Sequence, residues 1–251
     1  MGTFLIAFNQ ECPQSSQFRS WLRLPRIHDN PGMPRTARAS VGGICYHVIN
    51  RGNGRAQVFH TQSDYHDFVG LMQRSSSRIP MRVLSFCLMP NHFHFVVWPY
   101  NDGDISRWMH WLLTTHVRRY HQLRGSSGRV WQGRFKAFPI EQDRHLLTVM
   151  RYVERNPVRA NLVESAEDWD WSSRSRRNAA IVRQLQCDGP MAKPSNWLDL
   201  VDKPQTDAEI EALRRCSFKN APFGSEDWVQ DTATQLGLQS GLRGPGRRGH
   251  S

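Results

Sequence analysis

Two histidines, His92 and His94, stand one residue apart within the apolar run Leu88–Trp98, and they are well suited to binding a metal ion. Side chains on a β-strand point alternately to its two faces, so we expect both imidazoles on one face and Phe93 and Phe95 on the other. Neutral imidazole is a common ligand for divalent metal ions, and a strand fixes the spacing of its ligands. The pair therefore indicates half of a metal site, although two strand histidines can equally be packed or exposed without a ligand.

A tyrosine and an asparagine farther downstream offer the other half of this chemistry. Tyr152 and Asn156 are four residues apart in a segment expected to be helical, so they share one helix face. If this face covers the histidine strand, Asn156 offers an amide oxygen as third metal ligand and Tyr152 points its phenol at a metal-bound phosphate. Attack by the phenol would release a 3′ hydroxyl and leave a 5′-phosphotyrosine bond. The alternative role for Tyr152 is that of an ordinary core aromatic.

The charge distribution favours nucleic acid as the partner. The chain of 251 residues has a formal net charge of +11 and a pI near 10.1, and its segment 105–140 contains no acidic residue. Basic and aromatic residues alternate there, which suits single-stranded DNA because phosphates bind cations and unpaired bases stack on rings. A solvated helix face is the alternative for individual arginines. The residues expected to contact DNA, including one at the end of the first strand, are Arg51, Arg118, Arg119, Arg129, Trp131, Gln132, Arg134 and Lys136.

Hydrophobic periodicity predicts the elements that must hold these residues. Strands are expected at 44–49, 82–88, 92–98 and 135–140, and helices at about 64–75, 104–123 and 143–155. The order β-α-β-β-α-β-α is typical of an α+β, ferredoxin-like (split βαβ) antiparallel sheet with helices on one face, here with an added helix that carries Tyr152. Pro139 places the fourth strand at an edge of the sheet or near the strand's end.

Several other polar residues have simpler expected roles. Asp143 and Glu154 lie close to Tyr152 in sequence, but a helix cap or a surface position suffices for each. His47, on the first strand, is expected to be structural. Three histidines of the long helix could line a groove, but a surface or partly buried position is expected of them: His110, His116 and His121.

The rest of the chain is expected to flank one main domain at 41–175. Residues 1–40 lack periodicity, which predicts a disordered leader with an alternative start at Met33. Residues 174–188 are expected to be helical, 190–240 to form a small helical extension with a cap at Thr206, and 241–251 to form a flexible basic tail. Five scattered cysteines and no apolar run near eighteen residues favour a cytoplasmic, nucleoid-associated protein.

Three blocks of the sequence together resemble the signature of a known family. Asn91–His94, Gln132–Lys136 and Tyr152–Ala160 are similar, in order and in separation, to motifs of the REP-associated tyrosine transposases. These enzymes belong to the HUH superfamily of single-strand DNA transposases. Residues 46–53 and 171–173 resemble further pieces of the same family, so the resemblance covers about residues 34–175.

The resemblance implies a reaction and a role for each site residue. His92 and His94 would be the metal-binding histidines, Tyr152 would be the catalytic tyrosine, and Asn156 would stand where related enzymes have a polar third ligand, often Gln. The implied cofactor is Mg²⁺ or Mn²⁺. The implied partner is single-stranded DNA with a hairpin of the repetitive extragenic palindromic (REP) type, bound by a monomer or a homodimer. Two alternatives stay open: a hairpin-binding protein of this fold that no longer cuts, and a metal-dependent hydrolase, which would need further His, Asp or Glu ligands.

Overall fold

The structure, a computed structural model, describes residues 40–242, and its elements follow the expected order. The first part contains β1 (Cys45–Arg51), α1 (Gln62–Arg78), β2 (Met81–Met89), β3 (His92–Pro99), α2 (Asp104–Arg124), β4 (Lys136–Ile140) and α3 (Arg144–Glu154). It is followed by α4 (Asn156–Arg159), α5 (Ala179–Leu185), α6 (Trp197–Asp202), α7 (Asp207–Lys219), α8 (Glu226–Gln235) and α9 (Gln239–Leu242). The expected leader apart from Ser40, the Met33 start and most of the basic tail lie outside the described residues.

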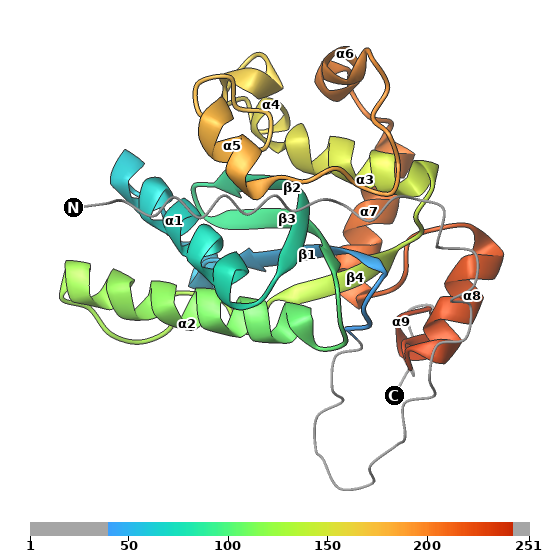
Figure 1. The fold of residues 1–251 in the computed structure, drawn as a ribbon, viewed down its shortest axis with the longest axis horizontal. Helices are drawn as coiled ribbons and strands as arrows, with labels where there is room; N and C mark the ends of the chain where they lie inside the picture. The colour runs from blue at the N-terminus through green and yellow to red at the C-terminus, as the bar shows by residue number, and fades with distance from the viewer. Residues whose placement is uncertain (1–39, 243–251) are drawn as a thin grey trace, which may run out of the picture.

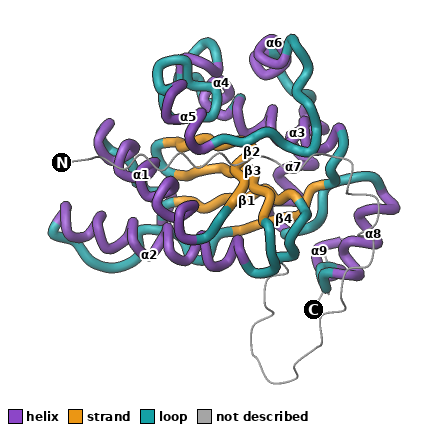
Figure 2. Tube along the Cα trace, viewed as in Figure 1, coloured by secondary structure: helices purple, strands orange, loops and turns teal. Residues whose placement is uncertain are grey.

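The four strands form one sheet in the order β2-β3-β1-β4, and every neighbouring pair is antiparallel. This is the split βαβ arrangement, so the expected α+β, ferredoxin-like fold is confirmed (Figure 2). The strand β4 forms one edge of the sheet. Pro139, which has no backbone N–H, is tolerated at this edge, and its carbonyl accepts a hydrogen bond from Phe223 N at 2.9 Å.

Helices cover the sheet on both faces (Figure 1). On one face α1 and α2 pack together, and Phe93 and Phe95 join their apolar residues in one core. On the other face α3, the added helix, lies against β2 and β3 and joins Leu84 and Val96 in a second core. Because successive residues of β3 point to opposite faces, this single strand contributes to both cores.

Three details of the helices differ from the expected boundaries. Thr61, rather than Asp64, is the N-cap of α1, and Asp64 completes a capping box with it. The helix also continues through Ser75, which is buried and donates its hydroxyl proton to Trp108 O at 3.0 Å instead of starting a loop. Within residues 174–188 only the segment α5 is helical.

The C-terminal helices pack against the sheet domain (Figure 1). The helix α6 contacts α3, and α7 contacts β4. Backbone bonding extends the edge of the sheet, since Glu141 N donates to Phe223 O at 3.0 Å. Thr206 and Glu209 form the expected capping box at the start of α7. None of the helices within residues 40–242 is both long enough and apolar enough to cross a bilayer.

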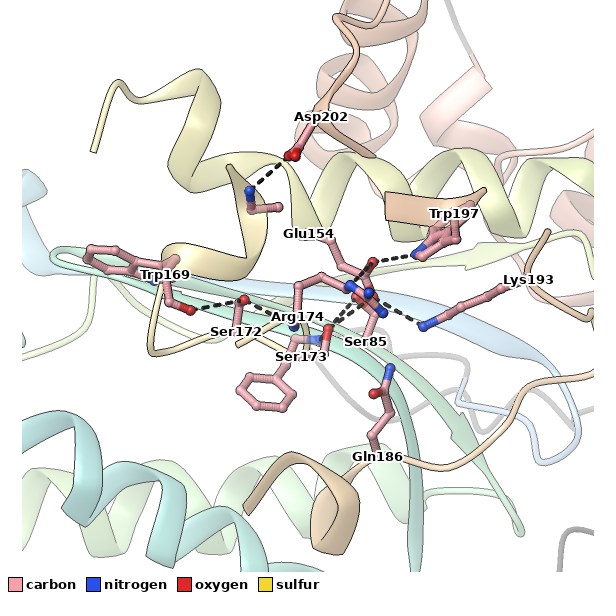
Figure 3. Close-up of polar contacts among 12 residues, drawn as sticks. Ser85, Glu154, Trp169, Ser172, Ser173, Arg174, Gln186, Lys193, Trp197 and Asp202 are labelled. Carbon is pink, nitrogen blue, oxygen red and sulfur yellow. Dashed lines mark hydrogen bonds and ion pairs between the residues drawn. The ribbon is translucent and has the colours of Figure 1, made fainter. Parts of the chain in front are cut away.

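Glu154, at the end of α3, is fully buried, which corrects the surface or cap role expected for it. Its carboxylate accepts hydrogen bonds from Trp197 Nε1 at 2.7 Å, from Ser173 Oγ at 3.0 Å and from Lys193 Nζ at 3.3 Å (Figure 3). The Arg174 guanidinium lies 3.9 Å away. A buried carboxylate is stable only when it is hydrogen-bonded and paired. These donors therefore fasten two later segments of the chain to α3.

Replacing Trp197 with Phe is expected to destabilise the protein, because it removes the shortest of these hydrogen bonds while keeping an aromatic ring in place. Hydrogen bonds to charged groups contribute about 1.5–3 kcal/mol, and we expect a loss of that size in the free energy of unfolding. Urea denaturation followed by circular dichroism measures it. Trp228→Phe, at a half-buried tryptophan of α8, is the matched control. Equal losses in the two variants would contradict an anchoring role for Glu154.

Candidate active site

The side chains of His92 and His94 leave β3 on the face that α3 covers. His94 is buried, with 2% of its surface exposed, and His92 is half-buried. Their ring centres are 5.0 Å apart. Phe93 and Phe95 lie in the core on the opposite face, as the alternation predicts. The strand thus holds the two imidazoles side by side while its other face is fixed in the core.

A hydrogen bond orients each of the two rings. His92 Nδ1 lies 2.7 Å from the side-chain oxygen of Asn91, and His94 Nδ1 lies 2.9 Å from Nε2 of His47. Since each Nδ1 is occupied, Nε2 is the nitrogen that either histidine can offer to a ligand. His47, expected to be structural, is 1% exposed and is the neighbour that orients His94.

Both histidines are neutral at pH 7. Burial lowers the pKa of His92 to about 4, and the guanidinium groups of Arg51 and Arg159 act in the same direction. Burial also holds the pKa of His94 well below its usual value, and the neighbouring His92 and His47 rings add to the effect. Neutral imidazole is the form that binds metal ions, so no proton has to be displaced from these rings at pH 7.

The helix α3 places Tyr152 beside the histidines. The Tyr152 ring centre lies 5.7 Å from that of His94 and 6.2 Å from that of His47, and both contacts are edge-on. Tyr152 is 6% exposed. The helix face that carries Tyr152 therefore covers the histidine strand. The side chains of Tyr152, His94 and His47 are in contact although they come from distant parts of the sequence.

Asn156 is buried one turn after Tyr152, at the start of α4. Its amide nitrogen donates to Tyr152 O at 2.8 Å, and its amide oxygen accepts a hydrogen bond from Arg159 Nη2 at 2.5 Å. Arg159 also donates to the Tyr152 hydroxyl at 3.4 Å, with its guanidinium carbon 4.4 Å from the ring centre. The oxygen expected to be a metal ligand is thus bonded to a cation. Arg159 was not among the expected site residues, although its position three residues after Asn156 places both on one helix face.

Exposed basic residues border the site at the end of β1. Arg51 is exposed and stands opposite His92 in the register of β1 and β3. The segment 130–132 is bound to the same end, because Asn53 N donates to Val130 O at 2.9 Å and Gln132 N donates to Arg51 O at 2.8 Å. We call the exposed residues gathered by this pairing and by β4 the basic rim: Arg51, Arg129, Gln132, Arg134 and Lys136.

The other residues expected to contact DNA are placed differently. Arg118 is exposed on α2, whereas Arg119 is partly exposed and forms an ion pair with Asp67 at 2.9 Å. Trp131 is a core residue: it is 5% exposed, and its ring centre lies 5.2 Å from that of Phe93. Burial of so large an apolar ring is favourable. The expected stacking of a base on Trp131 is therefore corrected, because its ring is not open to a ligand.

A second group of candidate metal ligands lies at the other end of α3. Oxygen and nitrogen atoms of Glu141, Asp143 and His145 lie within 4.8 Å of one another. Structural contacts explain two of them, since Asp143 caps α3 as expected by accepting from His145 N at 2.8 Å, and Glu141 accepts from Ser225 N at 2.6 Å. His145 and Tyr152 are seven positions apart in α3, about 10 Å along the helix axis. This group is therefore no source of extra ligands for the histidine pair.

His116 is more deeply buried than the partly exposed position expected for it. It is 6% exposed, and its Nδ1 has no hydrogen-bond partner among the described residues. Its ring centre lies 5.0 Å from that of Phe68 and 5.4 Å from that of Trp131. Burial lowers the pKa of His116 to about 4. The neutral ring therefore serves as part of the aromatic core between α1 and α2.

Fold and site together define a class of protein: an α+β domain in which two strand histidines face a tyrosine on an adjacent helix, next to a rim of exposed cations. Residues 40–156 match the model of the IS200-like transposase family. The resemblance to transposases seen in the sequence is thereby confirmed.

Three known proteins are similar to this chain. A protein of Haemophilus influenzae, provisionally named a REP-associated tyrosine transposase, is 28% identical over 123 residues, which are 44% of this chain and 69% of the relative. A solved REP-associated tyrosine transposase bound to a REP hairpin aligns over 69% of this chain and 93% of its own, with 18% identity and a TM-score of 0.49. A provisionally named transposase of Deinococcus radiodurans aligns over 61% of this chain and 99% of its own, with 13% identity and a TM-score of 0.34. The similarity to transposases rests on the two sequence matches and not on these structural likenesses.

Acidification is expected to destabilise the protein, in part through His116. Its pKa is about 4 in the folded state, against 6.5 for an unperturbed histidine, so the unfolded state binds a proton first. Stability therefore falls as the pH drops from about 6.5 toward 4, and at pH 5 this group lowers the free energy of unfolding by roughly 2 kcal/mol relative to pH 7.5. Urea denaturation at both pH values measures the effect.

The variant His116→Phe should lose this part of the pH dependence, because the ring it introduces cannot be protonated. His110→Gln, at an exposed histidine of the same helix, should keep the wild-type dependence. If the stability of His116→Phe depended on pH as that of the wild type does, the attribution of this pH dependence to His116 would be wrong.

Proposed function

We propose that this chain is a metal-dependent, single-stranded DNA endonuclease and strand transferase that acts at hairpins through a 5′-phosphotyrosine intermediate. The observation that carries the proposal is the Tyr152 ring, edge-on to His94 at 5.7 Å and covering the strand that also bears His92. A phenol next to two neutral imidazoles is the arrangement that tyrosine attack on a metal-bound phosphate requires. The match of residues 40–156 to the IS200-like transposase model supports DNA strand cleavage as the reaction.

The residues at this site fit a divalent metal ion. His92 and His94 are neutral, and the hydrogen bonds of their Nδ1 atoms leave Nε2 for a ligand. A bound Mg²⁺ or Mn²⁺, held by these two histidines and by the amide oxygen of Asn156, would polarise the scissile phosphate. Asn156 can serve in this way once Arg159 releases its oxygen.

Tyr152 is the proposed nucleophile. Its phenolic oxygen bonds to phosphorus, the bond from phosphorus to the 3′ oxygen breaks, and the 3′ oxygen leaves as a hydroxyl after taking a proton from solvent. The phenol proton is lost to solvent in the same step. Arg159 donates a hydrogen bond to this hydroxyl at 3.4 Å, so it can orient the phenol for attack. The 5′-phosphotyrosine bond keeps the energy needed for rejoining to another 3′ hydroxyl.

The basic rim is proposed to hold the DNA next to the site. Its cations can bind the backbone phosphates on both sides of the scissile bond. Arg118 and Arg119, on α2, are proposed to extend the contact. The relative from Haemophilus influenzae is named for association with REP sequences, which supports a REP-type hairpin as the substrate of this chain.

One observation favours a second candidate, a hairpin-binding protein that no longer cuts DNA. The Arg159 guanidinium is bonded to the Asn156 oxygen and lies over the Tyr152 ring. A cation fixed at this position opposes the binding of a metal ion by charge repulsion. The two candidates therefore differ in whether Arg159 moves when metal and DNA bind.

Tyr152→Phe is expected to abolish the covalent protein–DNA adduct and to keep DNA binding, since it removes the nucleophilic oxygen alone. The measurement is a denaturing gel of protein incubated with a labelled hairpin oligonucleotide from the gene's own flanks, with Mn²⁺ or with chelator. Tyr120→Phe, at a half-buried tyrosine of α2, should form the adduct like the wild type. An adduct in Tyr152→Phe would refute the mechanism, and wild-type binding with neither adduct nor nick would favour the second candidate.

Arg159→Ala is expected to tighten Mn²⁺ binding by about tenfold, because it removes a nearby positive charge and frees the Asn156 oxygen. Isothermal titration in the absence of DNA measures the affinity. The double variant Asn156→Ala/Arg159→Ala should lose part of this gain if Asn156 is a ligand. Arg51→Ala is the control, since Arg51 also depresses the pKa of His92 but has no contact with Asn156 among the described hydrogen bonds. Equal affinities for the single and double variants would exclude Asn156 as a ligand.

A further inference from the structure

Phe218, on α7, is an aromatic side chain that the fold leaves open to solvent. It is 75% exposed, more than the other large exposed hydrophobic residues of the described chain, Leu123 at 65% and Leu162 at 43%. The opposite side of α7 is buried, since Leu213 and Cys216 pack in the same core as α3. Phe218 is therefore directed outward by the packing of its own helix.

A lysine of the basic rim lies over the exposed ring. Lys136 Nζ is 5.0 Å from the ring centre of Phe218, and Lys136 begins the edge strand β4, which α7 contacts (Figure 1). The contact joins the C-terminal helices to the rim. An aromatic face with a cation beside it is suited to an unpaired base and the phosphate attached to it.

The register of the sheet connects this pair to the candidate active site. Ile49 of β1 stands opposite His94 of β3 on one side and opposite Lys136 of β4 on the other. Residues directly opposite one another project to the same face, so Lys136 shares the face of His94. Two strand spacings separate them, about 10 Å. A DNA strand that leaves the site along this row reaches Phe218 within a few nucleotides.

The charge of α7 is divided along its length. Its first half carries Asp207, Glu209 and Glu211, whereas Arg214 and Arg215 are exposed in the turn that precedes Phe218. Residues three and four positions apart share one helix face, so both arginines flank the ring. Phe218 thus lies among cations contributed by both α7 and β4.

We infer that Phe218 and Lys136 form a subsite for single-stranded DNA next to the candidate active site, in which an unpaired base stacks on Phe218 and its phosphate binds Lys136. This inference rests on the proposed function, and it gives the C-terminal helices a part in binding the strand that flanks the hairpin. A second copy of the chain is a poorer occupant. Like charges would repel at this patch, and one exposed ring falls well short of the area that a stable protein interface buries.

The test compares two labelled DNAs: a hairpin with a single-stranded extension, and the same hairpin with no extension. Fluorescence anisotropy should show that Phe218→Ala weakens binding of the extended hairpin by about 5- to 150-fold, the effect of losing one base–aromatic stack. Phe218→Trp should bind like the wild type. Leu123→Ala, at an exposed hydrophobic residue of α2, is the matched control and should also bind like the wild type.

Salt dependence separates the ring from the lysine. Phe218→Ala should leave the slope of log affinity against log salt unchanged, because no charge is removed. Lys136→Ala should reduce the magnitude of the slope by about 0.7, the value for one phosphate of a single strand.

The outcomes distinguish this inference from the proposed function. If the wild type binds neither DNA, the proposed function fails and the subsite fails with it. If the wild type binds the extended hairpin and Phe218→Ala binds it equally well, the subsite alone is refuted. Equal weakening on both DNAs, or a change of oligomeric state in light scattering caused by Phe218→Ala, would also refute it.

Discussion

The position of α3 depends on the hydrogen bonds that surround the buried carboxylate of Glu154. Such a charge must be surrounded by donors, and Ser173, Lys193 and Trp197 supply them from segments that follow α3 in sequence. Glu154 comes two residues after Tyr152, so the two side chains leave α3 in widely different directions. One side of the helix is therefore anchored to the later chain, while another side holds the tyrosine over the histidines.

The two faces of β3 also have different roles. Phe93 and Phe95 fix one face of the strand in the core under α1 and α2, and His92 and His94 occupy the other face. A slip of one residue in register would exchange the two sets, placing imidazoles in an apolar core. Core packing thus sets the orientation of the site, and the hydrogen bond between His94 and His47 on β1 then fixes the His94 ring.

The element order, the sheet and the meeting of Tyr152 with the histidines were predictable, because periodicity and spacing determine which residues share a face. The burial of Trp131 and of Glu154 was not predictable. A tryptophan among arginines in the sequence suits a DNA-binding surface as well as it suits a core, and the contacts of the Trp131 ring with Phe93 and His116 show that it lies in the core. The buried carboxylate of Glu154 depends on donors that lie 19 to 43 residues farther along the chain. Local sequence patterns carry no information over that distance, so its burial could not be predicted. The role of Arg159 was not predictable for a similar reason. Helical spacing predicts the helix face on which Arg159 lies, but not the hydrogen bonds that its guanidinium forms.

Electrostatics connects the parts of the site. Burial, and after it the charges of Arg51 and Arg159, depress the pKa of His92 and keep this ligand neutral. The same two arginines oppose the binding of a metal cation. A DNA phosphate reverses that balance, because it offsets the positive charge and is a stronger partner for Arg159 than the neutral Asn156 oxygen. Under the proposed function, phosphate binding therefore frees Asn156 for the metal ion. Thermodynamic coupling between two ligands is reciprocal, so a bound metal ion must increase the affinity for phosphate by the same factor as phosphate increases the affinity for metal. Neither ligand therefore needs a site that is complete before the other binds.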